Sequence, residues 1–287
     1  MLINAPRKVA LGASRGSTAA VEKFAGLSGW PIFLGRVLLY SIRDILFRFK
    51  YAKTVAQHVS DIVIGVGGTV VGGGMVFVTF TMSLFVGTEI GLQVFTGLEV
   101  IGAESFMGLV GSFMNVREIT PIIAGIALAA QCGSAFTAEL GAMRISEEID
   151  ALEVMGINSF AYLISTRVVA ALIALVPLYL IALFASFFAT RFISTQFFSL
   201  APGVYDYYFY LYLPMEDLIF STVKVAIFAF AVITIHCYHG YYASGGPVGV
   251  GRAAGSAIRM SIVTIVTLNL LLSYVFWGQG GSVRLAG

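Results

Sequence analysis

Long stretches with almost no charged residue constrain this chain most. Residues 168–190 and 260–277 contain no Asp, Glu, Lys or Arg at all. A helix needs about 20 apolar residues to cross the hydrocarbon core of a bilayer. Stretches of this kind lie at 62–87, at 119–138 within the longer run 104–139, at 168–190, at 218–235 and at 260–277. The sequence therefore predicts five transmembrane helices in an all-α integral membrane protein.

The overall composition agrees with this class. Charged residues make up 11% of the chain and hydrophobic residues 58%, whereas about a quarter of a typical soluble domain is charged. The formal net charge is only +2. Bases are not interleaved with aromatic residues as they are in a strand-binding groove. A nucleic-acid partner is therefore excluded.

The distribution of bases predicts the orientation. Nine of the seventeen Lys and Arg residues precede residue 54, and basic segments stay on the cytoplasmic side. We therefore expect a cytoplasmic segment at 1–30 and, after an odd number of spans, an extracytoplasmic C-terminal tail at 280–287. The connections at 88–104 and 191–217 then face outward, and the acidic connection after the second span faces the cytoplasm.

Residues 31–53 have a different character from the spans. Arg36, Arg43 and Lys50 are seven residues apart, so they share one face of a helix whose other residues are mostly Leu, Ile, Val and Phe. Such a helix lies in the membrane interface with its cations toward anionic headgroups. The segment contains six charged residues, too many for a sixth span. It is therefore predicted to be an interfacial amphipathic helix.

The connection at 139–157 contains five of the fifteen acidic residues of the chain. Ser146 is a suitable N-cap, acids follow it in the first turn, and Gly156 provides a stop. These signals predict a short helix at about 147–155. Its two faces differ: one carries an apolar stripe, and the neighbouring one carries acids. The stripe consists of Ile145, Ile149, Leu152 and Met155, and the acidic face of Glu147, Asp150 and Glu153.

Two interpretations of this short helix remain open. It is either a contact site for a soluble partner or a solvated connector between two spans.

Three charged residues interrupt the apolar runs. Arg117 and Glu118 lie within the second run, and Lys224 lies within the fourth. Ionisable groups at such depth face a cavity or a partner charge. A cation beside a hydrophobic cavity can bind the phosphate or carboxylate of a lipid. The alternative is structural: Glu118 pairs with Arg117 or Lys224 and holds two helices together.

The run REITPIIAGIALAAQCGSAFTAELGAMRISEEIDALEVMGI (117–157) resembles the signature of the MlaE/YrbE permeases, which are membrane subunits of ABC transporters that work with MCE proteins on lipids. A second run, KVAIFAFAVITIHCYHGYYASGGPVGVGRAAGSAIRMS (224–261), resembles the same family. The closest likeness is to the B-type YrbE subunit of an Mce complex. The resemblance implies a five-span permease domain at 54–279 with a coupling helix at about 145–156.

The resemblance also implies partners. The coupling helix would seat in a cytoplasmic ABC ATPase dimer, which binds ATP and Mg; the residues implied in that contact are Glu139, Arg144, Glu147, Glu148, Asp150, Leu152 and Glu153. Family members often have Glu-Gln where this chain has Glu147-Glu148. An A-type paralogous permease or a second copy, an extracytoplasmic MCE assembly and a lipid substrate complete the expected complex, a lipid importer in the bacterial inner membrane.

Catalytic machinery is not expected in this chain. The sequence contains neither a glycine-rich phosphate loop ending in Lys-Ser or Lys-Thr nor a nucleophile with a base, and its histidines lack the partners of a metal site. We therefore expect no metal, no cofactor and no ATPase activity of its own. Two other functions compete with an ABC permease: a proton-coupled lipid transporter that titrates Glu118, and a membrane anchor for MCE proteins that transports nothing.

Overall fold

The computed structural model describes residues 30–43, 51–65 and 74–278. Within these ranges the ordered elements are all helical, and five of them are long and apolar enough to cross a membrane. They comprise Gly74–Val100, Glu104–Ile145, Phe160–Phe197, Met215–Tyr241 and Gly246–Trp277. The prediction of an all-α membrane protein with five spans is confirmed.

Several spans are built from more than one helical segment. The labelled α-helices are α2 (Ala52–Ile64), α3 (Gly74–Val100), α4 (Met107–Phe113), α5 (Thr120–Leu128), α6 (Ser134–Ile145), α7 (Glu148–Val154), α8 (Thr166–Phe192), α9 (Pro202–Leu211), α10 (Met215–Tyr241) and α11 (Gly246–Trp277). A 3₁₀ turn precedes α4 at Glu104–Phe106, and π-helical turns occupy Met114–Ile119, Ala129–Gly133, Phe160–Ser165 and Ile193–Phe197. The second span is thus α4, α5 and α6 joined by π-helical turns.

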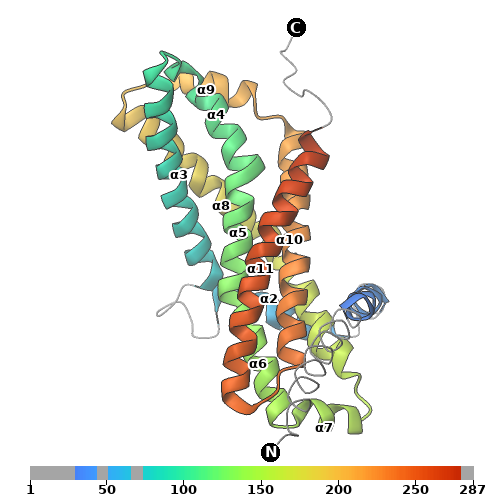
Figure 1. The fold of residues 1–287 in the computed structure, drawn as a ribbon. Helices are drawn as coiled ribbons and strands as arrows, with labels where there is room; N and C mark the ends of the chain where they lie inside the picture. Colours follow the sequence, from blue (N-terminus) through green and yellow to red (C-terminus); the bar gives the residue numbers. More distant parts are fainter. Residues whose placement is uncertain (1–29, 44–50, 66–73, 279–287) are drawn as a thin grey trace, which may run out of the picture.

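The spans run side by side and alternate in direction, so the connections gather at two ends (Figure 1). One end carries α7 and the α10–α11 turn, and the other carries α9 and the α3–α4 turn. Inside the bundle, α3 packs along α8, and α10 packs against α6, α8 and α11. This arrangement brings the second, fourth and fifth spans together.

The first predicted span has the wrong bounds. The sequence placed it at 62–87, but α2 ends at Ile64 and the spanning helix α3 begins at Gly74. Gly65 and Gly74 both have positive φ angles, +87° and +55°, a backbone conformation that glycine adopts without strain. Gly65 thus ends α2 and Gly74 begins α3, so the uncharged run at 62–87 does not form one helix. The expected connection at 88–104 is correspondingly short, because α3 continues to Val100.

A helix at 30–43 lies where the interfacial helix was predicted at 31–53. Residues 44–50, including Lys50, lie outside the described residues, and residues 51–53 belong to the start of α2. In Figure 1 the 30–43 helix is viewed almost along its axis at the α7 end, whereas the spans run up the picture. Phe33 and Val37 are buried. The Phe33 ring lies 5.0 Å from the ring of Phe160 and 5.1 Å from that of Tyr238. One face of this helix therefore packs on the third and fourth spans.

Small residues let α3 approach α8 closely. A Cβ atom added at Gly87 would lie 2.9 Å from Ser186 Cα and 3.0 Å from Ala189 Cβ, whereas one added at Gly97 on the same helix would meet nothing within 4 Å. Thr190 Oγ1 donates a hydrogen bond to Gly87 O at 3.0 Å. The contact between the two backbones thus depends on the missing side chain.

We expect Gly87→Ala to lower the free energy of unfolding by about 1–3 kcal/mol, because overpacking forces the two helices apart. Gly97→Ala is the matched control, since it gains helix propensity of up to ~1 kcal/mol without a new contact. Thermal unfolding of both variants in the same detergent measures the difference. Equal midpoints for the two variants would contradict the close α3–α8 contact.

Candidate functional site

Two of the three charged residues singled out in the sequence meet at the same place. Lys224 Nζ lies 3.6 Å from Glu118 Oε2, and the Lys224 side chain is fully buried. Arg117 instead pairs with Asp217 in the first turn of α10, with Nη2 2.7 Å from Oδ2 and Nε donating to Oδ2 at 2.8 Å. Arg117, Glu118, Asp217 and Lys224 are called the charged cluster below. It joins the second and fourth spans.

Pro121 explains why a lysine fits here. A proline has no N–H, so the helix cannot supply the usual donor to the carbonyl group of Arg117 four residues earlier, nor a π-helical donor to that of Val116. Side chains of α10 supply the two missing donors: Lys224 Nζ donates to Arg117 O at 2.6 Å, and Ser221 Oγ donates to Val116 O at 2.6 Å. The π-helical turn before α5 is therefore stabilised from α10.

Glu118 has its hydrogen-bond partners on the fifth span. Asn269 Nδ2 donates to Glu118 Oε2, and Ser273 Oγ donates to Oε1, both at 2.6 Å. Lys224 Nζ also donates to Ser273 Oγ at 2.6 Å. Even so, 43% of the Glu118 side chain is exposed. A carboxylate at this depth is thus accessible from one side and held by three polar partners on the other.

The partners contributed by the ends of the fourth and fifth spans were not predicted from the sequence. Asp217 was placed in an outer connection, but it is buried at the start of α10, where Trp277 Nε1 donates to its Oδ1 at 2.7 Å. The Arg117 guanidinium also lies 4.0 Å from the centre of the Phe113 ring. Asp217 and Lys224 are seven residues apart, so both lie on one face of α10. This spacing is the sequence signal that could have identified Asp217.

The acidic connection forms the expected short helix as α7 (Glu148–Val154). Ser146 is not its N-cap: that position belongs to Glu147, and Ser146 Oγ bonds to Ala142 O at 3.0 Å instead. The reason is that α6 continues to Ile145, so Ser146 ends α6 rather than beginning α7. Gly156 has φ +74° and follows the end of α7, as expected.

Only part of the predicted apolar stripe of α7 is buried. Ile149 is fully buried and Leu152 packs against the core, whereas Ile145 and Met155 are exposed. Val154, which the sequence analysis did not select, is 89% exposed. Two exposed apolar side chains at the end of α7 thus adjoin its acidic face.

The acids of α7 remain accessible. Arg144 Nη1 donates to Asp150 Oδ1 at 2.8 Å, and this pair is largely exposed, so it adds little to stability. Glu148 accepts a hydrogen bond from Ser146 Oγ at 2.9 Å. Glu147 has φ +61°, a left-handed conformation that is uncommon for a residue other than glycine. The surface of α7 is therefore acidic and exposed, and the chain turns at Glu147, between α6 and α7.

Glu139 belongs to a different group of charges. Arg167 Nη2 donates to Glu139 Oε2 at 3.0 Å, and Arg167 is buried. His58 of α2 lies close enough to interact electrostatically with both, and burial, followed by the charge of Arg167, lowers the pKa of His58 from 6.5 to about 4. These contacts attach α2 to the second and third spans at the α7 end.

The low pKa of His58 predicts acid sensitivity. Between pH 6.5 and about 4 an unfolded chain binds a proton at this histidine and the folded chain does not, so stability falls as the pH falls through this window. We expect His58→Gln to lose less of its thermal stability between pH 7 and pH 5 than the wild type. Parallel melting curves at the two pH values test this. An identical pH dependence in both proteins would contradict a neutral, half-buried His58.

Comparison with known proteins agrees with this architecture. A family model described as Permease MlaE matches residues 67–275. The probable ABC transporter permease proteins of Rickettsia bellii and Rickettsia felis are 33% and 32% identical over 195 residues, which cover 68% of this chain and 75% of each relative. The protein TRIGALACTOSYLDIACYLGLYCEROL 1, chloroplastic, of Arabidopsis thaliana is 32% identical over 203 residues, or 70% of this chain and 58% of that protein.

The matched residues begin before α3 and extend almost to the end of α11, so they include all five spans, the charged cluster and α7. The family resemblance found in the sequence is confirmed. This chain belongs to the MlaE permease family.

Proposed function

We propose that this chain is the permease subunit of an ABC-type lipid importer that works with MCE proteins, and that a separate subunit hydrolyses ATP. Family membership supports the permease role, and relatives in Rickettsia bear the name ABC transporter permease. The observation that carries the proposal furthest is the partly exposed Glu118 carboxylate beside the buried ammonium group of Lys224.

An exposed carboxylate on a membrane-spanning surface needs an explanation. Charged groups at such depth do not face lipid tails; they face water-filled cavities or other charged groups. On α11, which supplies two partners of Glu118, Val266, Leu270 and Tyr274 are exposed. A second permease packed against this surface, either an A-type paralogue or another copy, would enclose a space with apolar walls and a few charges. Such a space suits an amphiphile with acyl chains and a polar headgroup.

Coupling to ATP hydrolysis is assigned to α7. Its acids, together with exposed Val154 and Met155, form a protruding surface with both charge and apolar area. Helix-in-groove contacts use this combination. Closure of an ATPase dimer that holds ATP and Mg would push on α7 and move α6, because the buried side chain of Ile149 anchors α7 to the core.

The orientation follows from this assignment. We place the α7 end and the N-terminus in the cytoplasm, and the α9 end and the C-terminus outside the bacterial inner membrane, where the MCE assembly would deliver lipid to the permease. The excess of bases before residue 54 supports this orientation.

Purification of the tagged full-length chain from native membranes in mild detergent tests the proposed assembly. Mass spectrometry of the purified material should identify an ABC ATPase, MCE proteins and a second permease chain. A labelled, unrelated membrane complex from the same cells controls for dissociation in detergent. A chain that purifies alone while the control complex stays intact would contradict the proposal.

A further inference from the structure

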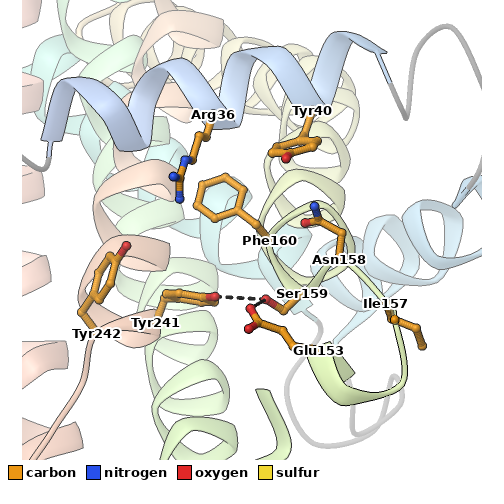
Figure 2. Close-up of a pocket in the computed structure, with 10 residues that line it drawn as sticks. Arg36, Tyr40, Glu153, Ile157, Asn158, Ser159, Phe160, Tyr241 and Tyr242 are labelled. Carbon is orange, nitrogen blue, oxygen red and sulfur yellow. Dashed lines mark hydrogen bonds between the residues drawn. The ribbon is translucent and has the colours of Figure 1, made fainter. Parts of the chain in front are cut away.

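The α7 end contains a pocket of about 450 Å³ that lies apart from the charged cluster and shares only Glu153 with the acidic face of α7. It lies between the 30–43 helix, the connection that follows α7 and the last turn of α10 (Figure 2). Lys224 and Tyr241, which lines the pocket, are 17 positions apart on α10, or about 25 Å along the helix axis. A ligand here would therefore be separate from one at the charged cluster.

The two sides of the pocket carry opposite charges. Arg36 points into it from the 30–43 helix, is exposed, and has no ion-pair partner among the described residues (Figure 2). Glu153 lies on the opposite side, where its Oε1 accepts a hydrogen bond from Ser159 Oγ at 2.7 Å. Ser159 Oγ lies 3.0 Å from the hydroxyl group of Tyr241. These contacts hold one carboxylate oxygen in place and leave the other available.

Aromatic rings surround the space between these charges. Tyr40, Phe160, Tyr241 and Tyr242 all line the pocket. The rings of Tyr40 and Phe160 are 5.9 Å apart, and those of Phe160 and Tyr241 are 6.1 Å apart. Aromatic faces close to a carboxylate attract organic ammonium groups, and an unpaired guanidinium attracts phosphate.

We propose that this pocket binds the headgroup of a phospholipid that carries both a phosphate and an ammonium, with the phosphate on Arg36 and the ammonium between the aromatic rings and Glu153. The ligand is a lipid rather than a soluble compound because the 30–43 helix exposes apolar residues beside the pocket. These are Ile32, Leu38, Leu39 and Ile42. The volume lies within the range of small-molecule sites.

Such a lipid would contact the 30–43 helix and the connection after α7 at once. The headgroup would then hold the membrane-surface helix against the segment that leads from α7 into the third span. The site adds a bound lipid at the α7 end to the transport path proposed above, and it does not depend on that path.

Native mass spectrometry of the purified full-length protein with added lipid tests the site. The probes are dimyristoyl phosphatidylethanolamine and dimyristoyl phosphatidylglycerol, which has the phosphate but no ammonium. The variants are Arg36→Gln and Glu153→Gln. Arg252→Gln removes an exposed cation near the start of α11 and serves as the matched control. Melting curves show whether each variant is folded.

We expect the wild type to bind the ethanolamine lipid more tightly than the glycerol lipid. Arg36→Gln should weaken ethanolamine-lipid binding about tenfold, since a hydrogen bond to a charged group is lost, and Glu153→Gln should remove the preference between the two lipids. Arg252→Gln should bind as the wild type does.

Three results would overturn the proposal. In the first, Arg36→Gln binds lipid as tightly as Arg252→Gln does. In the second, the wild type shows no preference for the ammonium-bearing headgroup. In the third, soluble phosphoethanolamine competes at the same concentration as the lipid, which would identify a soluble ligand. If Arg36→Gln fails to fold, Glu153→Gln still decides the outcome through the lipid preference.

Discussion

Lys224→Met is expected to lower lipid transport by roughly tenfold or more and to destabilise the permease. The substitution keeps the length of the side chain but removes the donor to Arg117 O and the cation beside Glu118. Because 43% of Glu118 is exposed, loss of the ion pair costs less than the about 3–5 kcal/mol of a fully buried pair, while loss of a charge-assisted hydrogen bond costs about 1.5–3 kcal/mol. Melting curves and lipid transfer by the purified complex in liposomes measure the two effects.

A double variant separates structure from function at this site. Lys224→Met/Glu118→Gln removes both charges, so it should recover much of the stability lost in Lys224→Met, because no unpaired carboxylate remains. We expect its transport to stay low. If the double variant regains both stability and transport, Glu118 and Lys224 are only a structural lock between helices, which was the alternative considered from the sequence.

Charge reversal on α7 is expected to release the ATPase. In Glu147→Lys/Asp150→Lys two exposed acids become bases, so a groove that accepts acidic side chains would repel the helix. Both positions lie at the surface, and the Arg144–Asp150 pair is exposed, so the permease itself should fold normally. Quantification of ATPase and MCE proteins that copurify with the variant should show loss of the ATPase alone.

The control for this variant carries the same change of charge at the opposite end. Glu99→Lys/Glu216→Lys alters two exposed acids at the α9 end and should keep the ATPase. Equal ATPase recovery from the two variants would contradict the role of α7 as the contact site and would leave it a solvated connector.

The sequence predicted the spans well because a bilayer demands long uncharged helices, which are visible in composition alone. It failed at the first span: α2 ends before Gly65 and α3 begins only at Gly74, so the uncharged run at 62–87 does not form one helix. The N-cap prediction for Ser146 was also wrong, because helix α6 extends to Ile145 and Ser146 is its C-cap. Where a local sequence pattern fits two structures, only the contacts made in the folded chain show which of the two forms.

The candidate site was predictable in part. Glu118 and Lys224 were selected because charges are costly within apolar runs, and the structure brings them together. Asp217 could have been selected by its spacing of seven from Lys224, whereas Asn269 and Ser273 could not, because uncharged polar residues within spans are common. The packing of α11 on the turn before α5 shows that Asn269 and Ser273 hold Glu118.

The most direct test of the proposed function is lipid transfer by the complete complex in liposomes. Transfer of a labelled phospholipid is measured with ATP, with a non-hydrolysable ATP analogue, and with ATP plus an uncoupler that collapses any proton gradient. For an ABC permease we expect transfer with ATP, none with the analogue, and no effect of the uncoupler. Transfer that runs on a proton gradient without ATP would contradict it and assign Glu118 to proton coupling, and a complex that moves no lipid under any condition would be a membrane anchor for its partners.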